Sequence, residues 1–391
     1  MNLFPIVSRD NSVEQHSDIL IVGGGVIGLT TAYHLAQRHV SVTVVDRQAV
    51  GQEASWAGAG MLPPGNFQNA KTPEARLRAY SHQLWTDLST DLLQRTGIDN
   101  GYRRCGAVEV CSTPGQRELE SQVAGWRDEG IVVEDLDRLG LESKIAGLNE
   151  EFCSGVFLPD FGQARNPRHL KSLATACRQL GVEIVEHADH LSLHVSDNNV
   201  VSAKMPTRRF VADQICVTAG SWSAQLLESV CFALPVRPVR GQVVQLQLPQ
   251  LSFSCVVEMG RRYIVPRADG LILVGSTEEY AGFEKRNTSE GVSGLLRFAE
   301  SIAPELKDAE VVRCWAGLRP GSPDELPFLG RVPGFENLFV GAGHFRSGLQ
   351  MSPGTGAVLA DLLMNHSPAI DLDGLTCEPH RLCQETGTRS E

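Results

Sequence analysis

The stretch DILIVGGGVIGLTTAYHLAQRHVSVTVVD, residues 18–46, decides the fold of this 391-residue chain. Its first apolar run, residues 19–22, lacks the alternation of a half-exposed strand and predicts a strand buried on both faces of a parallel sheet. Three glycines follow with the spacing G-x-G-x-x-G, namely Gly23, Gly25 and Gly28. The first allows a tight turn, the second lets a ligand reach the backbone, and the third lets the next helix pack closely on the strand.

The rest of this stretch completes a dinucleotide-binding pattern. A helix after the glycines would direct its free N-terminal amides, beginning with Val26 and Ile27, toward a pyrophosphate. A second apolar run, residues 42–45, ends at Asp46, whose carboxylate can accept both hydrogen bonds from an adenosine ribose, and Arg47 follows it. We therefore predict a dinucleotide without a 2′-phosphate. A doubly wound sheet with a fortuitous glycine turn is the alternative.

Composition restricts the class of protein. The chain is 42% hydrophobic and 21% charged, which suits a soluble protein with two sizeable cores. Its formal net charge of −11 and its lack of a basic run argue against nucleic acid as a partner. No apolar stretch reaches the ~18 residues that a membrane helix needs, and residues 1–17 carry both charge signs, unlike a signal peptide. We expect a cytoplasmic homo-oligomer without a membrane partner.

The cysteines point to a reduced compartment. The ten cysteines form no C-x-x-C pair, and most lie in apolar strand or helix contexts. We expect them to act as small buried hydrophobic residues, with structural disulfides as the alternative. We expect no metal site.

The pattern of strands and helices predicts a chain that crosses twice between two domains. Parallel-sheet and helix patterns would form a discontinuous α/β dinucleotide-binding domain from residues 18–100, 151–234 and 313–365. Short strands in an antiparallel pattern would form an α+β substrate domain from residues 101–150 and 235–312. Residues 1–17 and 366–391 are expected to be loosely ordered tails.

Two loops indicate a flat, bulky ligand. The loop of residues 51–65 has small residues that would let the backbone pass close to an isoalloxazine: Ala54, Ser55, Ala59, Gly60 and Met61. An ordinary surface loop is the alternative. Gly220 marks another strand end where the backbone must approach a ligand or a neighbouring element. Residues 341–356 lead into a helix whose N-terminal amides could stabilise a reduced, anionic flavin; an ordinary helix cap is the alternative.

Several segments together resemble the FAD-dependent D-amino-acid oxidase superfamily. They are GGGVIG with Asp46, the EASWAGAGML loop, AGSWS at 219–223, RYIVPR at 262–267, CWAGLRPGSPDELPFLG at 314–330 and VGAGHFRSGLQMSPGTG at 340–356. Within the superfamily they are most similar to the glycine oxidases of thiamine biosynthesis. The resemblance runs from about residue 18 to 365. It implies a glutathione-reductase-type, Rossmann-like FAD-binding domain beside the substrate domain.

The resemblance also implies a reaction. Hydride would pass from the α-carbon of glycine or a small amino acid to flavin N5, and O2 would be reduced to H2O2. The imine would hydrolyse to an oxo acid and ammonia, or supply thiazole synthesis. The FAD would be noncovalent, because the chain has no cysteine between Cys314 and Cys377 to tether it as monomeric sarcosine oxidases do.

The family's functional residues have counterparts here. Arg319 matches the arginine that grips the substrate α-carboxylate, Tyr263 matches the tyrosine that braces it, and Arg346 matches an arginine at the flavin and substrate. Further flavin contacts are implied at Arg319, Gly343, Arg346, Ser347, Gly348 and Leu349. A D-amino-acid or sarcosine-type oxidase or dehydrogenase would use the same residues. A flavin-binding subunit without catalysis is the alternative from another class.

One pair of residues departs from the family. Arg261 and Glu278 replace a histidine and a methionine of the glycine oxidases with which we compare the chain. A two-residue turn at Asp269-Gly270 would pair Tyr263 with Ser276, and Arg261 with Glu278. We therefore hypothesise a cross-strand ion pair that forms a polar gate at the rim of the substrate pocket.

Overall fold

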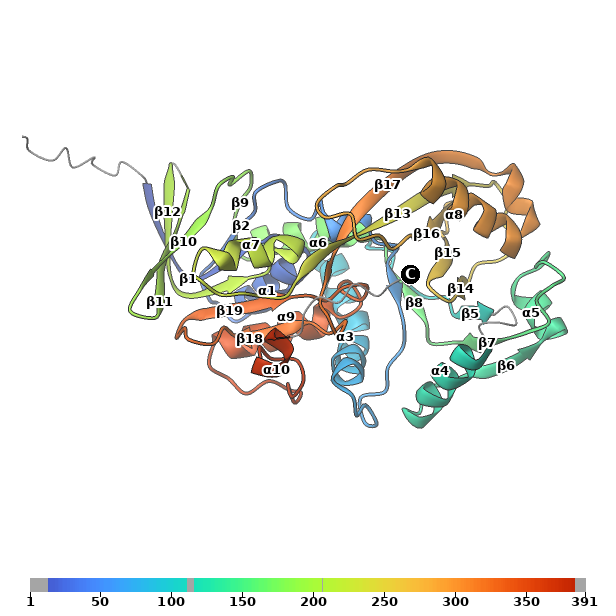
Figure 1. Ribbon diagram of the computed structural model, residues 1–391, viewed down its shortest axis with the longest axis horizontal. Coiled ribbons are helices and arrows are strands. Elements are labelled where there is room, and N and C mark those ends of the chain that lie inside the picture. Colours follow the sequence, from blue (N-terminus) through green and yellow to red (C-terminus); the bar gives the residue numbers. More distant parts are fainter. Residues whose placement is uncertain (1–12, 111–115, 206, 384–391) are drawn as a thin grey trace, which may run out of the picture.

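The computed structural model describes residues 13–110, 116–205 and 207–383. The molecule is elongated, and each of its two lobes contains an eight-stranded sheet (Figure 1). None of the described helices is long and apolar enough to span a membrane. The nine cysteines within the described ranges are free thiols, and Cys111 lies outside those ranges.

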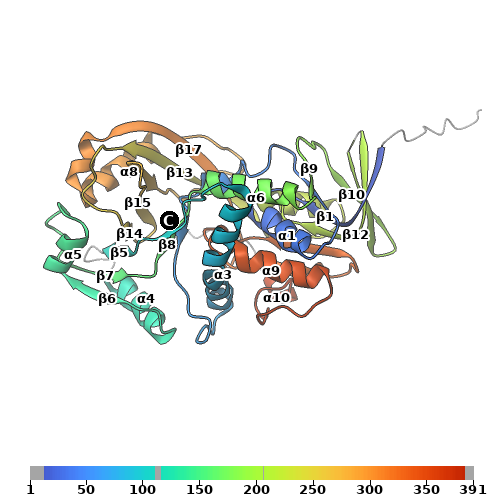
Figure 2. The same ribbon diagram turned by 180° about the vertical axis from the view of Figure 1, so that it is seen from behind.

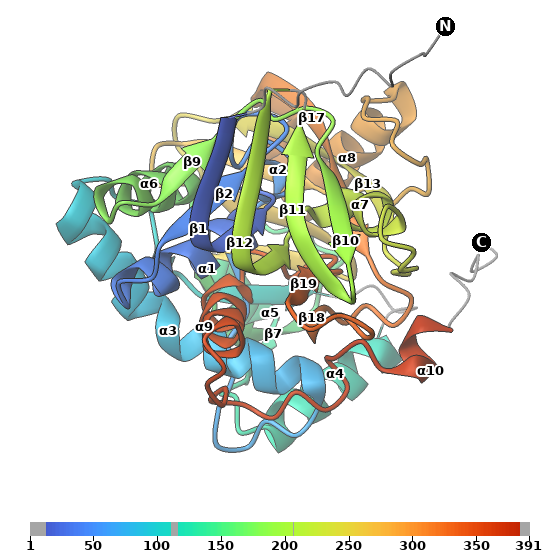
Figure 3. The ribbon, with the colours of Figure 1, turned by 90° about the vertical axis from the view of Figure 1, so that its left-hand side faces the viewer.

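The centre of the first sheet is parallel. Its strands run in the order β9 (Glu183–Val185), β2 (Val42–Val45), β1 (Val13–Val22), β12 (Arg208–Val217) and β19 (Leu338–Ala342), and the antiparallel β10 (Ser192–Ser196), β11 (Asn199–Met205) and β18 (Phe328–Arg331) extend it. Figure 3 shows β9, β2, β1, β12, β11 and β10 side by side. Ile21 packs into the core on one face, and Leu20 packs into the core on the other. Burial on both faces explains the apolar run without alternation.

Helices cover both faces of this sheet. One face carries α1 (Val26–Gln37), α3 (Pro73–Thr96), α6 (Asn166–Gln179) and α9 (Ser352–Leu363), and the other carries α7 (Ser223–Glu228). Gly28 allows the close approach of α1, because a Cβ there would overlap the carbonyl oxygen of Gly23. This doubly wound arrangement confirms the predicted α/β class.

The second sheet is antiparallel except for one pair. Its order is β17 (Glu310–Gly321), β13 (Arg237–Gln247), β16 (Leu271–Gly275), β15 (Arg262–Pro266), β14 (Val256–Met259), β5 (Ala107–Val110), β7 (Ser154–Leu158) and β6 (Glu134–Asp137). Only β14 and β5 run parallel. The core on one face includes α8 (Ser289–Ile302) and the short η3 (Pro304–Asp308), with α5 (Arg138–Lys144) beside them. The core on the other face includes α4 (Gln116–Asp128) and Tyr263.

Short elements join the two lobes. They are α2 (Ala54–Ala57), the 3-10 turn η2 (Gly220–Trp222), and a small sheet of β3 (Met61–Leu62), β4 (Arg103–Arg104) and β8 (Gly162–Gln163). Figure 2 shows β8 and α3 near the middle of the molecule. Arg267, just after β15, donates to Gln163 Oε1 and to the carbonyl oxygen of Ala59, both at 2.6 Å. A buried guanidinium therefore fixes the second sheet against the loops of the first lobe.

Domain ends differ from those expected. Strand β1 begins at Val13, so residues 13–17 belong to the sheet rather than to a loose leader; residues 1–12 and 384–391 lie outside the described ranges. Strands β7 and β17 lie in the second sheet, although residues 151–234 and 313–365 were assigned to the first domain. The local sequence pattern does not predict this position of β17, because β17 pairs with β13, a strand that is distant in the sequence.

The C-terminal segment is packed rather than loose. Ile370 and Leu375 lie in a buried cluster with Val358 of α9. Arg381 of α10 (Pro379–Leu382) is 2% exposed, and its guanidinium donates to both carboxylate oxygens of Asp324 at 2.8 and 3.1 Å. The polar composition of residues 366–383 therefore includes a charged residue that is paired inside the fold.

The hairpin between β15 and β16 is one residue out of the predicted register. Tyr263 pairs with Gly275 rather than with Ser276, and Pro266 pairs with Ile272. The loop holds three residues instead of two, because Arg267 donates its backbone N–H to the carbonyl oxygen of Leu271 at 2.8 Å. Gly270 occupies the left-handed position, with φ of 80°. A type I turn with a glycine bulge therefore replaces the predicted two-residue turn.

Candidate active site

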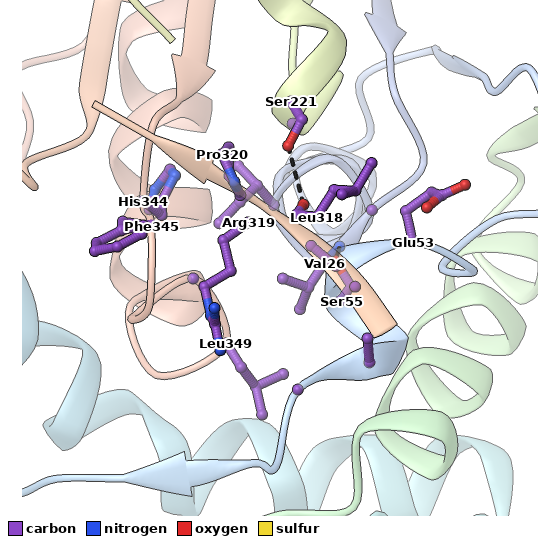
Figure 4. A pocket seen from close by; sticks show the side chains of 18 of the residues that line it. Val26, Glu53, Ser55, Ser221, Leu318, Arg319, Pro320, His344, Phe345 and Leu349 are labelled. Atoms are coloured by element: carbon purple, nitrogen blue, oxygen red, sulfur yellow. Dashed lines mark hydrogen bonds between the residues drawn. The ribbon is translucent and has the colours of Figure 1, made fainter. Parts of the chain in front are cut away.

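A cavity of about 920 Å³ runs between the two lobes. It extends from the carboxyl ends of β1 and β2 to the face of the second sheet that carries Tyr263. Most of the predicted site residues line it: Gly23, Gly25, Val26, Ile27, Asp46, Arg47, Ala54, Ser55, Ala59, Gly60, Met61, Gly220, Tyr263, Arg319, Arg346, Ser347, Gly348 and Leu349. Figure 4 shows part of this lining, with Val26 and Ser55 close together and Arg319 on β17.

Two predicted cofactor contacts do not line the cavity. Gly28 lies behind the turn, where it permits packing of α1 on β1. Gly343 has φ of 85° and turns the chain after β19, beside Phe328 and Ser322. Both glycines therefore shape the backbone around the site without contacting its interior.

The turn after β1 has the geometry that a pyrophosphate requires. Gly23 has φ of 115°, and Thr218 Oγ1 donates to its carbonyl oxygen at 2.7 Å. Helix α1 begins at Val26, whose backbone N–H donates to Ser55 Oγ at 2.9 Å. The small-residue loop therefore lies over the positive end of α1, where an anion would be stabilised.

Asp46 faces this end of the cavity with its carboxylate held by the backbone. Its Oδ2 accepts from the N–H of Gly24 at 2.7 Å, and its Oδ1 accepts from the N–H of Gln48 at 2.8 Å. Burial raises the pKa of the Asp46 carboxyl, while these two N–H donors oppose the rise. A carboxylate has about four acceptor positions, so lone pairs remain for the two hydroxyls of a ribose.

Arg47 and Trp222 form a second wall at the nucleotide end. The Arg47 guanidinium lies 3.6 Å from the centre of the Trp222 indole, and its Nη2 lies 3.3 Å from Glu53 Oε1. Sequence reasoning identified Gly220 but missed Trp222. The signal available was the AGSWS segment, where an aromatic residue follows a glycine at a strand end.

The loop after β19 provides another wall through Gln350. Helix α9 starts at Ser352, and residues 352–356 do not line the cavity; the Gly354 N–H donates to Ser81 Oγ at 3.1 Å. These amides do not face the cavity, and α3 supplies a partner for that of Gly354. The stabilisation of a reduced flavin by the positive end of this helix stays a prediction. His344 lines the cavity, and burial lowers its pKa to about 3. It stays neutral, bonded to Thr355 Oγ1 at 3.0 Å.

Arg319 and Tyr263 lie together at the other end of the cavity. Arg319 Nη1 donates to the Thr277 carbonyl oxygen at 3.1 Å, and Nη2 donates to Ser276 Oγ at 2.5 Å. Its guanidinium crosses Gly241, and the Tyr263 phenol crosses Gly275, since a Cβ at either glycine would overlap these groups. Sequence reasoning missed both glycines, although glycine inside a strand signals a close approach.

Strand β17 is fixed to the first lobe beside Arg319. Ser221 Oγ of η2 donates to the Leu318 carbonyl oxygen at 2.9 Å (Figure 4). Burial lowers the pKa of Arg319, while the charges of nearby acidic groups oppose the change. The guanidinium is thus held by hydrogen bonds at a half-buried position in the cavity, which favours a strong interaction with a carboxylate.

The predicted ion pair between Arg261 and Glu278 forms, with Nη1 and Oε1 2.6 Å apart. Neither residue lines the cavity. Glu278 Oε2 also lies 3.7 Å from Arg346 Nη1, and Arg346 Nη2 donates to the Arg261 carbonyl oxygen at 2.7 Å. The pair therefore contacts Arg346, and it is not part of the cavity lining where a polar gate would act.

The residues of the cavity fit FAD. Amides and a turn at the positive end of α1 suit the pyrophosphate, and Asp46 has free acceptor positions for the ribose. Between this end and Arg319 the wall is built from small residues: Ala54, Ala57, Gly58, Ala59 and Gly60. Such a wall leaves room for a flat ring system against the backbone.

Comparisons with known proteins agree with this geometry. The model of the FAD dependent oxidoreductase family matches residues 18–362. The glycine oxidase of Pseudomonas putida is 34% identical over 355 residues, which cover 90% of this chain and 96% of that protein. The bifunctional protein ThiO/ThiG of Synechocystis is 35% identical over 90% of this chain and 53% of its own length.

A solved structure is similar along almost its whole length. The crystal structure of glycine oxidase from Geobacillus kaustophilus superposes with a TM-score of 0.88 at 31% identity. The match covers 93% of this chain and 99% of that one.

Proposed function

Because the chain belongs to the family of FAD-dependent oxidoreductases, we propose that it oxidises glycine or another small amino acid with noncovalent FAD and O2. One observation carries the proposal: Arg319 and Tyr263 line one end of a cavity whose other end has the dinucleotide turn and Asp46. The likeness to glycine oxidases supports the choice of substrate.

The substrate carboxylate is expected to bind at Arg319. A guanidinium has five N–H donors, and the two described bonds leave donors for a two-pronged contact. The Tyr263 hydroxyl would brace the same carboxylate, and Arg346 would add positive charge beside it. Because Arg319 on β17 and Tyr263 on β15 reach the same cavity from one sheet, the α-carbon would be held in a fixed orientation.

Bound FAD would supply the acceptor for the hydride that leaves the α-carbon, and would pass the electrons to O2 to give H2O2. The chain needs no general base if the amine enters neutral. His344 is buried and bonded to Thr355, so we give it no proton-transfer role. The imine product would hydrolyse to an oxo acid and ammonia, or serve thiazole synthesis in thiamine formation.

The test uses purified protein. It should be yellow, lose its colour anaerobically with glycine, regain the colour in air, and release peroxide. Colourless protein that takes up no FAD would exclude an FAD-dependent reaction. Bleaching without reoxidation by air would indicate a dehydrogenase. A panel of glycine, sarcosine and D-alanine would separate a glycine oxidase from sarcosine-type and D-amino-acid enzymes.

We further propose that the protein works in the cytoplasm as a homo-oligomer. The exposed thiols of Cys153, Cys231 and Cys383 are free, which suits a compartment that keeps cysteines reduced. Light scattering of the purified protein would measure the mass of the assembly, and a monomer would contradict this part of the proposal.

A further inference from the structure

A row of side chains crosses the face of the second sheet that lines the cavity. The register pairs Glu109 of β5 with Glu258 of β14, Glu258 with Tyr263 of β15, and Tyr263 with Gly275 of β16. Residues directly opposite one another share a face of the sheet. Glu258 therefore points to the same side as Tyr263, and it lines the cavity.

These two carboxyl groups have no bonded partner of opposite charge. Within the described residues, neither Glu109 nor Glu258 forms an ion pair or a hydrogen bond. Arg346 attracts Glu258 electrostatically, but its guanidinium is bonded to the Arg261 carbonyl oxygen and lies near Glu278. Glu109 is buried and Glu258 is half-buried, and a carboxyl withdrawn from water without a bonded cation is costly to ionise. The wall therefore has room for one more positive charge.

The pKa values of Glu109 and Glu258 reflect the absence of a bonded cation. Burial raises the pKa of both carboxyls, and the neighbouring negative charges of Glu258 and Glu118 raise that of Glu109 further. The positive charge of Arg346 lowers the pKa of Glu258 and so opposes the effect of burial. At neutral pH the pair can thus keep a proton until a cation enters, and a cation would favour the ionised form of the group it meets.

The distance to Arg319 excludes glycine as the source of this cation. The Arg319 guanidinium lies over Gly241 of β13 and bonds to Ser276, next to β16. Glu258 is on β14, two strands beyond β16. Neighbouring strands lie about 4.8 Å apart, so the backbone of Glu258 lies roughly 10 Å from that of Gly275, the residue before Ser276. A ligand that reaches both needs a chain of several bonds between its carboxylate and its cation.

We propose that the cavity also accepts an amino acid whose side chain ends in an amine, with the α-carboxylate at Arg319 and the second ammonium at Glu258. The inference rests on the proposed function, because Arg319 provides the carboxylate end. Glu258 then determines specificity, and Glu109 retains its proton beside it. An apolar side chain of equal length would displace water from Glu258 without replacing the hydrogen bonds that this water makes to the carboxylate. Such a ligand would therefore bind less well.

A binding measurement tests this without turnover. 5-Aminopentanoate and pentanoate share a carboxylate and a carbon chain, only the first has an ammonium, and neither has an α-amine to oxidise. Calorimetric titration of the FAD-loaded protein should show 5-aminopentanoate binding about 10- to 100-fold more tightly, the range for a hydrogen bond to a charged group. 4-Aminobutanoate and 6-aminohexanoate would measure the best distance between the charges.

Matched variants locate the contact. Glu258→Gln should remove the preference, since glutamine keeps the size but not the charge. Glu120→Gln removes the same charge from the exposed surface of α4 and should keep the preference. Equal affinity for the two ligands in the wild type, or a preference that survives Glu258→Gln, would overturn the inference.

Turnover separates this inference from the proposed function. The ratio of kcat/KM for D-ornithine to that for D-norvaline should exceed one in the wild type and fall about 10-fold or more in Glu258→Gln. Oxidation of glycine without any preference for the cationic ligands would sink the inference alone. A Glu258-dependent preference in a protein that oxidises no amino acid would support it while refuting the proposed reaction.

Discussion

Replacing Arg319 by alanine tests the substrate end of the cavity most directly. The guanidinium is held by two hydrogen bonds, to Thr277 and Ser276, and it lies against Gly241 on a strand. Alanine would leave the substrate carboxylate without its charged partner in a site that excludes water. We expect FAD to stay bound, because the contacts proposed for its pyrophosphate and ribose lie at the other end of the cavity.

The size of the loss follows from the burial of the pair. Truncating one partner of a desolvated, hydrogen-bonded charge pair costs about 2–5 kcal/mol. Since about 1.4 kcal/mol corresponds to a tenfold change, kcat/KM for glycine should fall roughly 30-fold to several thousand-fold. Arg319→Lys should recover only part of this loss, because an ammonium cannot make the two-pronged contact of a guanidinium.

Peroxide formation at varied glycine concentration gives kcat/KM, and the flavin spectrum reports cofactor content. Arg262→Ala is the matched control, because Arg262 is exposed and does not line the cavity. It should remain near the wild-type value. A kcat/KM for Arg319→Ala within a factor of about three of wild type, in protein of normal melting temperature, would remove Arg319 from the substrate site.

Three further variants test the cofactor end, the C-terminal segment and the acidic pair. Asp46→Ala should weaken FAD binding at least about 10-fold by titration, and activity that stays lost at saturating FAD would contradict this. Arg381→Ala should lower the free energy of unfolding by about 3–5 kcal/mol, measured in urea, because Asp324 loses its partner; an unchanged midpoint would refute it. The pKa of Glu109 in the folded protein is raised from its ordinary value of 4.5 to about 8. The contribution of Glu109 to stability is therefore fully present below about pH 4.5 and is lost as the pH rises to about 8. Glu109→Gln should therefore raise the melting temperature more at pH 9 than at pH 5, and an equal change at both would be inconsistent.

The nucleotide end was predictable because its information is local. Strand, glycines, helix and acid lie within residues 18–46, and each residue type is required by the backbone or by the ligand beside it. The position of β17 was not predictable in this way. Its pairing with β13 joins segments more than sixty residues apart, as in Val243 with Trp315. No local pattern records which of two sheets a strand joins.

The C-terminal segment shows a second limit of sequence patterns. Arg381 contributes to a polar composition, yet the side chain is buried, because Asp324 and the carbonyl oxygens of Leu326 and Pro327 satisfy its donors. Charge counts along a sequence do not reveal such pairing. The buried Ile370 and Leu375 were the available signal, but they are too few and too widely spaced to predict an element by periodicity.

The Arg261 and Glu278 pair formed although the predicted register was wrong, and the reason changes its role. Long side chains can reach a diagonal neighbour across two strands, so an error of one residue does not separate them. The shift does remove the pair from the cavity wall, where Glu278 instead approaches Arg346. Glu278 thereby offsets charge on Arg346 that would otherwise act more strongly on Glu258. Arg261 and Glu278 thus belong to the same charge network as Arg346 and Glu258. In this network Glu258 is the carboxylate that remains for the cation of a ligand.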